Sequence, residues 1–207
     1  MDRQQTVFVV DDDEGIRDGL RVLLATIKQP CETFASAAEF LASYDPQQAG
    51  CLLLDIRMPQ MSGLELQQEL NKRGSNLPII FITGHGDIPM AVEAMRNGAL
   101  DFVRKPFREH DLLDRINEAL TLELTKRKWS IEHDELLARL SSLSEREKAV
   151  FERVADGEMN KVIGFDLGIS ERTVEVHRAN VMKKLNVRTL AELIRVKITA
   201  ESARPIE

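Results

Sequence analysis

The sequence predicts an α/β protein in which a doubly wound, five-stranded parallel sheet is joined by a long helix to an all-α domain of four helices. Short apolar runs alternate with segments of helical period over the first half of the chain. A long stretch without Gly or Pro follows, and only helical patterns come after it. A chain of 207 residues is long enough for two small hydrophobic cores. We therefore predict domains at 1–122 and 141–207, with a helical linker at 123–140.

The strands of the predicted sheet are the apolar runs at 6–10, 51–54, 78–82 and 101–103, together with a weaker one at 31–34. Helices with apolar residues three or four positions apart are predicted between the strands, at 14–27, 36–43, 64–72 and 87–96. Strands that alternate with helices in this way favour a parallel sheet that is covered on both faces.

The rest of the chain is predicted to be helical. One long helix, or two nearly collinear ones, is expected at 109–140, and four short helices are expected at 142–157, 159–168, 170–185 and 188–198. Ser144 and Ser170 are suited to cap the starts of the first and third short helices. Gly157 and Gly168 are suited to end the first and second.

Charge and composition narrow the class of protein. The formal net charge is −6, yet residues 170–197 carry seven basic and three acidic side chains, which indicates an anion-binding surface near the C-terminus. No apolar run approaches the roughly 18 residues of a membrane span, and the first residues lack a signal-peptide pattern, so we expect a cytoplasmic protein. Cys31 and Cys51 are expected to be reduced thiols without a catalytic role.

Polar side chains follow four of the predicted strands, at the point where each strand ends. Asp11 to Asp13 follow the first strand, Asp55 ends the strand at 51–54, and Thr83 and Lys105 follow the last two. The carboxyl ends of parallel strands meet at one edge of a sheet, where ligands bind. The sequence therefore predicts an acidic site with a hydroxyl and a lysine at this edge.

Clustered carboxylates repel one another unless a cation lies among them, and oxygen ligands from separate loops suit Mg²⁺. We predict Asp12 and Asp55 as direct ligands, Asp11 as a ligand through water, and the backbone carbonyl of Arg57 as a further oxygen. Asp55 is then a candidate nucleophile toward a phosphoryl group. Lys105 would stabilise the charge on the transferring oxygens, and Thr83 would donate a hydrogen bond to the phosphoryl group.

The segments "VVDDD", "LLLDIRMPQMSG", "FITGHGD" and "DFVRKPF" resemble, in order and spacing, the receiver domain of two-component response regulators, which has a flavodoxin-like fold. The resemblance implies that Asp55 is the phosphoacceptor, that Asp11 and Asp12 hold Mg²⁺, and that Thr83 is the switch hydroxyl. In this family the peptide bond that corresponds to the one between Lys105 and Pro106 is often cis. Phe102 matches the switch aromatic of the family, with a plain core residue as the alternative.

Residues from Asn160 onward follow the spacing of a helix-turn-helix, in which two helices cross closely. A small residue comes fifth (Gly164), a glycine ninth (Gly168) and an apolar β-branched residue fifteenth (Val174). The helix at 170–185 would then enter the major groove of DNA, and a helical protein-binding bundle is the alternative. The predicted DNA contacts are Asn160, Lys161, Arg172, Thr173, Glu175, Val176, Arg178, Ala179, Lys183 and Lys184.

The segment from Leu143 to Val196 is similar to the LuxR-type DNA-binding domain, and "LGIS", "TVEVHRANVMKKL" carry most of the likeness. Its pairing with a receiver is typical of the NarL/FixJ class. The resemblance implies a transcription factor that takes phosphate from a sensor histidine kinase, forms a homodimer when phosphorylated, binds double-stranded promoter DNA and is a candidate to contact RNA polymerase.

The same residues leave two other functions open. One is a phosphorylation-driven adaptor that binds proteins and not DNA. The other is an aspartyl-phosphate phosphatase. Such an enzyme needs two acids separated by one residue after its first strand, one as nucleophile and one as acid and base, and Asp11 and Asp13 have this spacing. On the regulator interpretation the chain is not an enzyme beyond catalysing its own phosphorylation, with slow autodephosphorylation.

Overall fold

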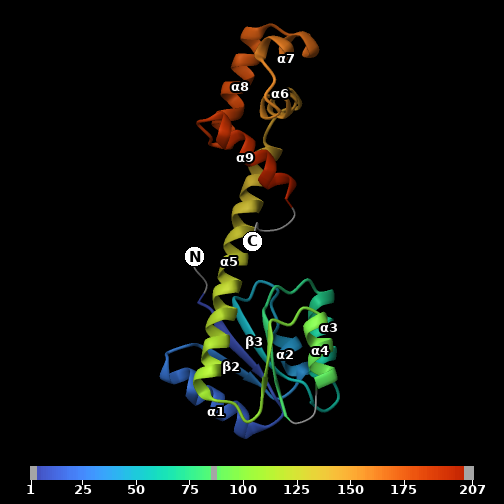
Figure 1. The fold of residues 1–207 in the computed structure, drawn as a ribbon, viewed down its shortest axis with the longest axis vertical. Coiled ribbons are helices and arrows are strands. Elements are labelled where there is room, and N and C mark those ends of the chain that lie inside the picture. The colour runs from blue at the N-terminus through green and yellow to red at the C-terminus, as the bar shows by residue number, and fades with distance from the viewer. Residues whose placement is uncertain (1–3, 85–87, 203–207) are drawn as a thin grey trace. The chain divides into compact units, whose positions relative to one another are not determined.

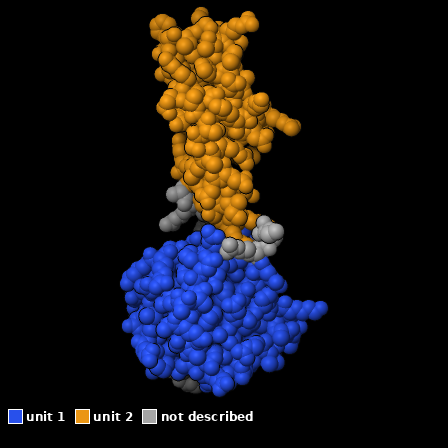
Figure 2. Space-filling view, turned by 180° about the vertical axis from the view of Figure 1, so that it is seen from behind, with its two compact units in different colours: residues 1–125 blue, residues 126–207 orange. Residues whose placement is uncertain are grey.

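The computed structural model describes residues 4–84 and 88–202. The chain forms two compact units, residues 1–125 and residues 126–207 (Figure 2), and each is described by itself below. The predicted linker at 123–140 is divided between them. The predicted start of a helix at Asp87 lies outside the described residues.

The first unit is built on a five-stranded sheet whose strands are all parallel (Figure 1), which confirms the predicted fold class. The strand order is β2-β1-β3-β4-β5. The strands are β1 (Thr6–Val10), β2 (Cys31–Phe34), β3 (Gly50–Asp55), β4 (Ile79–Thr83) and β5 (Asp101–Arg104). The run at 31–34, the weakest in the sequence, forms the edge strand β2.

Helices cover both faces of this sheet. They are α1 (Glu14–Thr26), α2 (Ala37–Ser43), α3 (Gly63–Lys72), α4 (Ile88–Arg96) and α5 (Glu109–Ser141). Successive strand residues point to opposite faces. Val9 and Leu53 therefore pack under α1 and α5, whereas Phe8 and Leu52 pack under α2, α3 and α4. Both faces are apolar, which is why the strands read as continuous apolar runs.

Gly63 lets α3 begin directly against the carboxyl end of β3. A Cβ atom at this position would lie 2.1 Å from the backbone oxygen of Asp55. The Gly63 N–H donates to the carbonyl of Ile56 at 2.9 Å, and Ser62 caps the helix in a capping box with Glu65. This close approach fixes the backbone that carries Asp55.

The second unit is helical in all of its described elements. After the end of α5 come α6 (Glu145–Ala155), α7 (Asn160–Leu167), α8 (Glu171–Leu185) and α9 (Leu190–Glu201). Ser144 and Ser170 cap α6 and α8, and Gly168 ends α7 in the left-handed conformation with φ 67°, as predicted. Its core contains Val150, Phe151, Ile163, Val174, Val181, Leu185 and Leu193. Within the described residues, no helix is both long enough and apolar enough to cross a membrane.

We expect Gly63→Ala to disturb the first unit. The added methyl group meets a backbone oxygen, which does not yield as a flexible side chain would, so the loop after β3 has to shift. The free energy of unfolding should fall by about 1–3 kcal/mol, as is usual for overpacking. Calorimetric unfolding of the whole chain measures this change.

Gly19→Ala is the matched control, because Gly19 is an exposed residue of α1 and an added Cβ meets nothing within 4 Å. This substitution should leave stability unchanged or raise it by up to about 1 kcal/mol through helix propensity. Equal unfolding temperatures for the two variants would contradict the account of Gly63.

Candidate functional site

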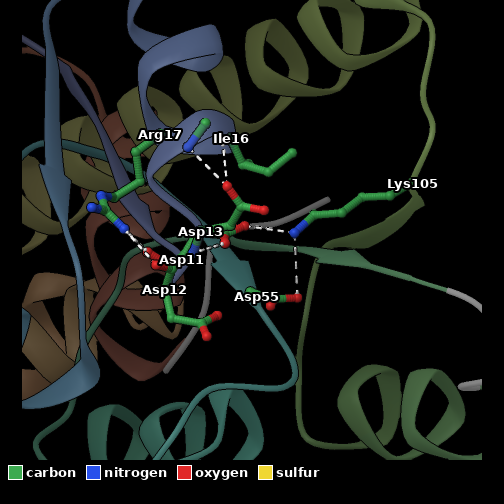
Figure 3. A network of polar contacts seen from close by, with 8 residues as sticks. Asp11, Asp12, Asp13, Ile16, Arg17, Asp55 and Lys105 are labelled. Atoms are coloured by element: carbon green, nitrogen blue, oxygen red, sulfur yellow. Dashed lines mark hydrogen bonds and ion pairs between the residues drawn. The ribbon is translucent and has the colours of Figure 1, made fainter.

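Three carboxylates meet at the carboxyl edge of the sheet. Asp11 and Asp12 follow β1, and Asp55 ends β3, the strand next to β1 (Figure 3). One oxygen from each lies within 4.8 Å of the others. Asp11 and Asp55 are buried, whereas Asp12 is exposed. The sheet thus brings together the acids that the sequence predicted at this edge.

Lys105 brings a positive charge into the cluster. Its Nζ lies 2.6 Å from Oδ2 of Asp11 and 3.7 Å from Oδ1 of Asp55 (Figure 3). Its backbone N–H donates to the carbonyl of Thr83 at 2.6 Å, which ties the loop after β5 to the end of β4. The bond between Lys105 and Pro106 is cis. The lysine ammonium therefore offsets part of the repulsion between Asp11 and Asp55.

Burial raises the pKa of Asp55 to about 6, because the ionised form loses water. The ammonium of Lys105 acts in the opposite direction and lowers this pKa, and the charge of Asp11 raises it. Asp55 is thus a carboxylate whose ionised form is incompletely compensated. A further cation at this edge would favour that ionised form, which is the nucleophilic one.

The residues fit a magnesium ion. The donor set consists of carboxylate oxygens from three residues at the ends of two neighbouring strands, which is the ligand chemistry that Mg²⁺ prefers, and Asp12 is open to water. Arg57, whose backbone carbonyl is the fourth predicted ligand, lies on the exposed loop two residues after Asp55.

Arg17 takes part in this site, although its sequence position gave no sign of it. From α1, its Nη1 donates to the backbone carbonyls of Asp11 at 2.7 Å and Asp12 at 2.9 Å (Figure 3). These two bonds fix the peptide units that carry two of the acids. The signal available in the sequence was an arginine one helical turn after the acidic run, which alone does not identify a partner.

Asp13 does not belong to the acid cluster. Its Oδ1 accepts from the backbone N–H of Gly15 at 2.8 Å and of Ile16 at 3.3 Å, so it caps α1. The phosphatase alternative needs this carboxylate as an acid and base beside Asp11. The capping bonds occupy it and weigh against that alternative.

Thr83 and Phe102 lie near the site on neighbouring strands. Thr83 is 2% exposed at the end of β4. Phe102 on β5 is 38% exposed, so the alternative that it is a plain core residue is wrong. β5 is an edge strand of the sheet, and its residues alternate between half-buried and exposed. The sequence pattern alone does not distinguish a covered from an uncovered edge position.

In the second unit, α7 and α8 cross closely at Gly164. A Cβ there would lie 2.9 Å from the backbone oxygen of Ile169, in the turn between the helices. Val174 and Val181 of α8 are buried. Seven of the predicted DNA contacts are exposed on α7 and α8: Lys161, Arg172, Glu175, Val176, Ala179, Lys183 and Lys184. Three more, Asn160, Thr173 and Arg178, are half-buried, and Nη1 of Arg178 lies 3.4 Å from Oδ1 of Asn160.

Two family models match the chain. One, described as the response regulator receiver domain, covers residues 7–117, and the other, described as bacterial regulatory proteins of the luxR family, covers residues 141–197. The transcriptional regulatory protein FixJ of Rhizobium meliloti is 44% identical over 191 residues, which is 92% of this chain and 94% of the relative. The chain belongs to the response regulators of the NarL/FixJ class.

Other response regulators match over most of their length. The response regulator protein TmoT of Ectopseudomonas mendocina is 46% identical over 195 residues, covering 94% of this chain and 89% of the relative. The solved structure of the response regulator StyR has a TM-score of 0.88 at 50% identity and covers 94% of this chain and 98% of its own. This NarL/FixJ-class regulator is thus a phosphorylation-controlled, DNA-binding transcriptional regulator, whose domains imply a histidine kinase and DNA as partners.

Lys184 of this regulator, one of the exposed predicted DNA contacts, also has a structural contact. Its Nζ lies 2.6 Å from Oε2 of Glu147, which is 5% exposed, and donates to the carbonyl of Ser142 at 3.2 Å. The Lys184 ammonium and the capping bonds from Ser144 lower the pKa of Glu147 to about 2. Lys184 therefore joins α8 to the start of α6, and its contact with DNA stays a prediction.

We expect Arg17→Met to weaken magnesium binding. The substitution keeps the length of the side chain but removes both donors to the loop that carries Asp11 and Asp12, so these ligands lose their orientation. Loss of such support usually lowers metal affinity by about 10-fold or more. Calorimetric titration with Mg²⁺ measures the affinity without any phosphorylation step.

Arg21→Met is the matched control, since Arg21 lies one turn further along α1, pairs with Asp18 at 2.6 Å and makes no contact with the acidic loop in the described contacts. Its magnesium affinity should equal that of the wild type. Equal affinity in the Arg17 variant as well would show that the two carbonyl contacts do not support the site.

Proposed function

We propose that Asp55 accepts a phosphoryl group from a phosphohistidine of a sensor kinase, with Mg²⁺ held by Asp11, Asp12, Asp55 and the backbone carbonyl of Arg57. The observation that carries this proposal is the meeting of three carboxylates and the Lys105 ammonium at one edge of the sheet. Bound Mg²⁺ would neutralise charge on the phosphoryl oxygens.

The residues of the site have separate parts in this transfer. An oxygen of ionised Asp55 attacks phosphorus, and the P–N bond of phosphohistidine breaks with its electron pair going to the imidazole, which takes up a proton. Lys105 stabilises the charge on the phosphoryl oxygens. The Thr83 hydroxyl donates to one of these oxygens once the acyl phosphate has formed. Slow attack by water on phosphorus breaks the P–O bond to Asp55, releases inorganic phosphate and returns Asp55 to the carboxylate.

Phosphorylation then acts on an apolar surface of the same unit. Thr83 ends β4, and the next strand, β5, carries Phe102. Val92 and Met95 of α4 are 46% and 44% exposed, and Phe102 is 38% exposed, although all three are apolar. We infer that Thr83 and Phe102 act as the switch and that this surface pairs two copies of the chain. Phosphate must favour the pairing conformation over the resting one for this coupling to operate.

DNA binding belongs to the unit assigned to residues 141–207, after a receiver at 1–122 and a helical linker at 123–140. In this proposal α8 enters the major groove, where Glu175 accepts from cytosine N4 and Val176 or Ala179 contacts a thymine methyl group. The basic residues supply sequence-independent affinity through phosphates. The proposed contacts are Asn160, Lys161, Arg172, Thr173, Glu175, Val176, Arg178, Ala179, Lys183 and Lys184. The proposed partners are a sensor kinase, promoter DNA and RNA polymerase. A protein that binds promoter DNA acts in the cytoplasm, which is the localisation we propose.

The test is the mass of the protein in solution with Mg²⁺, before and after treatment with a small-molecule phosphodonor, for the wild type and for Asp55→Asn. The wild type should change from monomer to dimer, because the acyl phosphate favours the pairing surface. The Asp55 variant should stay a monomer, since an amide has no nucleophilic carboxylate.

Binding to duplex DNA is measured on the same samples at two salt concentrations. Dimerisation should raise affinity for DNA, and affinity should fall steeply with salt if phosphates are contacted. A donor-dependent dimer without salt-dependent DNA binding would favour the adaptor function. Dimerisation of Asp55→Asn by the donor would rule out Asp55 as the acceptor.

A further inference from the structure

A fully buried amide joins α3 to α4, which lie side by side on one face of the sheet (Figure 1). The side chain of Gln67 on α3 is 0% exposed, and its Nε2 donates to the carbonyl of Ala94 on α4 at 3.0 Å. An amide oxygen in that place would face the carbonyl oxygen and repel it, so this bond fixes which way the amide points. Oε1 of the amide is then buried without a hydrogen-bond partner among the described residues.

Packing alone does not account for Gln67. Its neighbours on the same helix, Leu66 and Leu70, belong to the apolar cluster under α2, α3 and α4. A buried acceptor without a partner destabilises a fold, whereas an apolar side chain of similar length avoids that free-energy cost. The one thing that an apolar side chain could not provide here is the directed bond to the Ala94 carbonyl.

The position of α4 on the sheet is weakly defined by its own side chains. Of the side chains of α4 that the structure describes, the buried ones are Ala91 and Ala94, which are 4% and 0% exposed. A methyl group makes few van der Waals contacts with the strands below, so tilting or sliding of the helix loses little. The same helix carries Val92 and Met95 of the proposed pairing surface. A directed bond to α4 therefore determines where that surface lies.

The described bonds from α3 hold the C-terminal end of α4. One turn further along α3, Nδ2 of Asn71 donates to the carbonyl of Asn97, directly after the last residue of α4, at 2.9 Å. The chain then joins the sheet, since the N–H of Leu100 donates to the carbonyl of Ile79 at 2.8 Å. This end of α4 is thus tied to both α3 and the sheet. The opposite end follows β4, which ends at Thr83.

We propose that Gln67 and Asn71 form a pivot at the C-terminal end of α4. Movement that begins at Thr83 on phosphorylation then rotates the helix about this end and brings its apolar surface to the pairing position. Both are positioning residues, because they act through α4 and not on the phosphoryl group. Without the pivot, the same movement is lost in sliding of the whole helix. The inference rests on the proposed function, because it needs a dimer that forms on phosphorylation.

The experiment compares the full-length wild type with Gln67→Met, which keeps the length of the side chain and removes both polar atoms of the amide. Dimer dissociation constants are measured by analytical ultracentrifugation with Mg²⁺, before and after treatment with a small-molecule phosphodonor. Phosphate per chain, from the intact mass, and the unfolding temperature are measured on the same samples.

Two further variants of α3 complete the design. Gln68→Met is the matched control, because Gln68 is the next residue of the helix, is exposed and makes no bond to α4 in the described contacts. Asn71→Ala removes the second bond of the pivot from an exposed position, so its result does not depend on how the core accommodates a methionine.

Gln67→Met should take up phosphate as the wild type does and keep or raise its unfolding temperature. The unpartnered acceptor is gone, and the Ala94 carbonyl keeps the bond from the Ala99 N–H at 3.0 Å. The ratio of the dimer dissociation constants before and after phosphorylation should fall about five- to ten-fold, as for the loss of one buried hydrogen bond. Asn71→Ala should lower this ratio about two-fold, because its bond is exposed to water. The Gln68 control should match the wild type.

Four results would overturn the pivot. The first is an unchanged ratio in both Gln67→Met and Asn71→Ala. The second is a lower unfolding temperature of Gln67→Met with the ratio of the wild type, which would make the amide purely structural. The third is tighter pairing of Gln67→Met without the donor, because the bond would then restrain the resting conformation. The fourth is reduced phosphate uptake by Gln67→Met, which would give the amide a part in the transfer itself.

The wild type separates this inference from the one on which it rests. Failure of the wild type to form a dimer after it has taken up phosphate would overturn the pairing in the proposed function. A wild type that pairs on phosphorylation, beside a Gln67 variant that pairs equally well, would overturn the pivot alone.

Discussion

The Lys105 ammonium, 2.6 Å from Asp11 and 3.7 Å from Asp55, is the interaction on which the acidic site of the receiver depends. Three carboxylates within 4.8 Å of one another repel, and burial adds to the free-energy cost of ionising Asp55. The lysine offsets part of this cost, but the pKa of Asp55 remains raised, so part of the cost of ionisation is not compensated. The remainder makes the site receptive to a divalent cation and keeps the Asp55 carboxylate reactive.

The backbone around the acids is fixed from outside the cluster. Arg17 holds two peptide units of the first loop, and Gly63 lets α3 begin against the Asp55 carbonyl. Such supports orient the ligands of a charged site before the ion or the phosphoryl group arrives. In the DNA-binding unit the ion pair between Glu147 and Lys184 gives similar support, since it joins α8 to α6.

The sequence contained enough information for the fold and the acidic site, because both follow from periodicity and from polar residues at strand ends. Asp11, Asp12, Asp55 and Lys105 could be predicted together since parallel strands end at one edge. Arg17 could not, because it donates to backbone carbonyls, which have no sequence signature. The ion pair of Lys184 could not be predicted for a related reason: its partner Glu147 lies 37 positions away. The exposure of Phe102 depends on how far the helices cover an edge strand, which the pattern of β5 does not encode.

The measurement that tests the account most directly is the location of the phosphate in the protein after treatment with a phosphodonor, by mass spectrometry of the intact chain and its peptides, across a titration of Mg²⁺. The account predicts one phosphoryl group per chain, in the peptide that contains Asp55, with incorporation that rises with Mg²⁺. Incorporation at another residue, or at Asp55 to the same extent with the metal chelated, would contradict it.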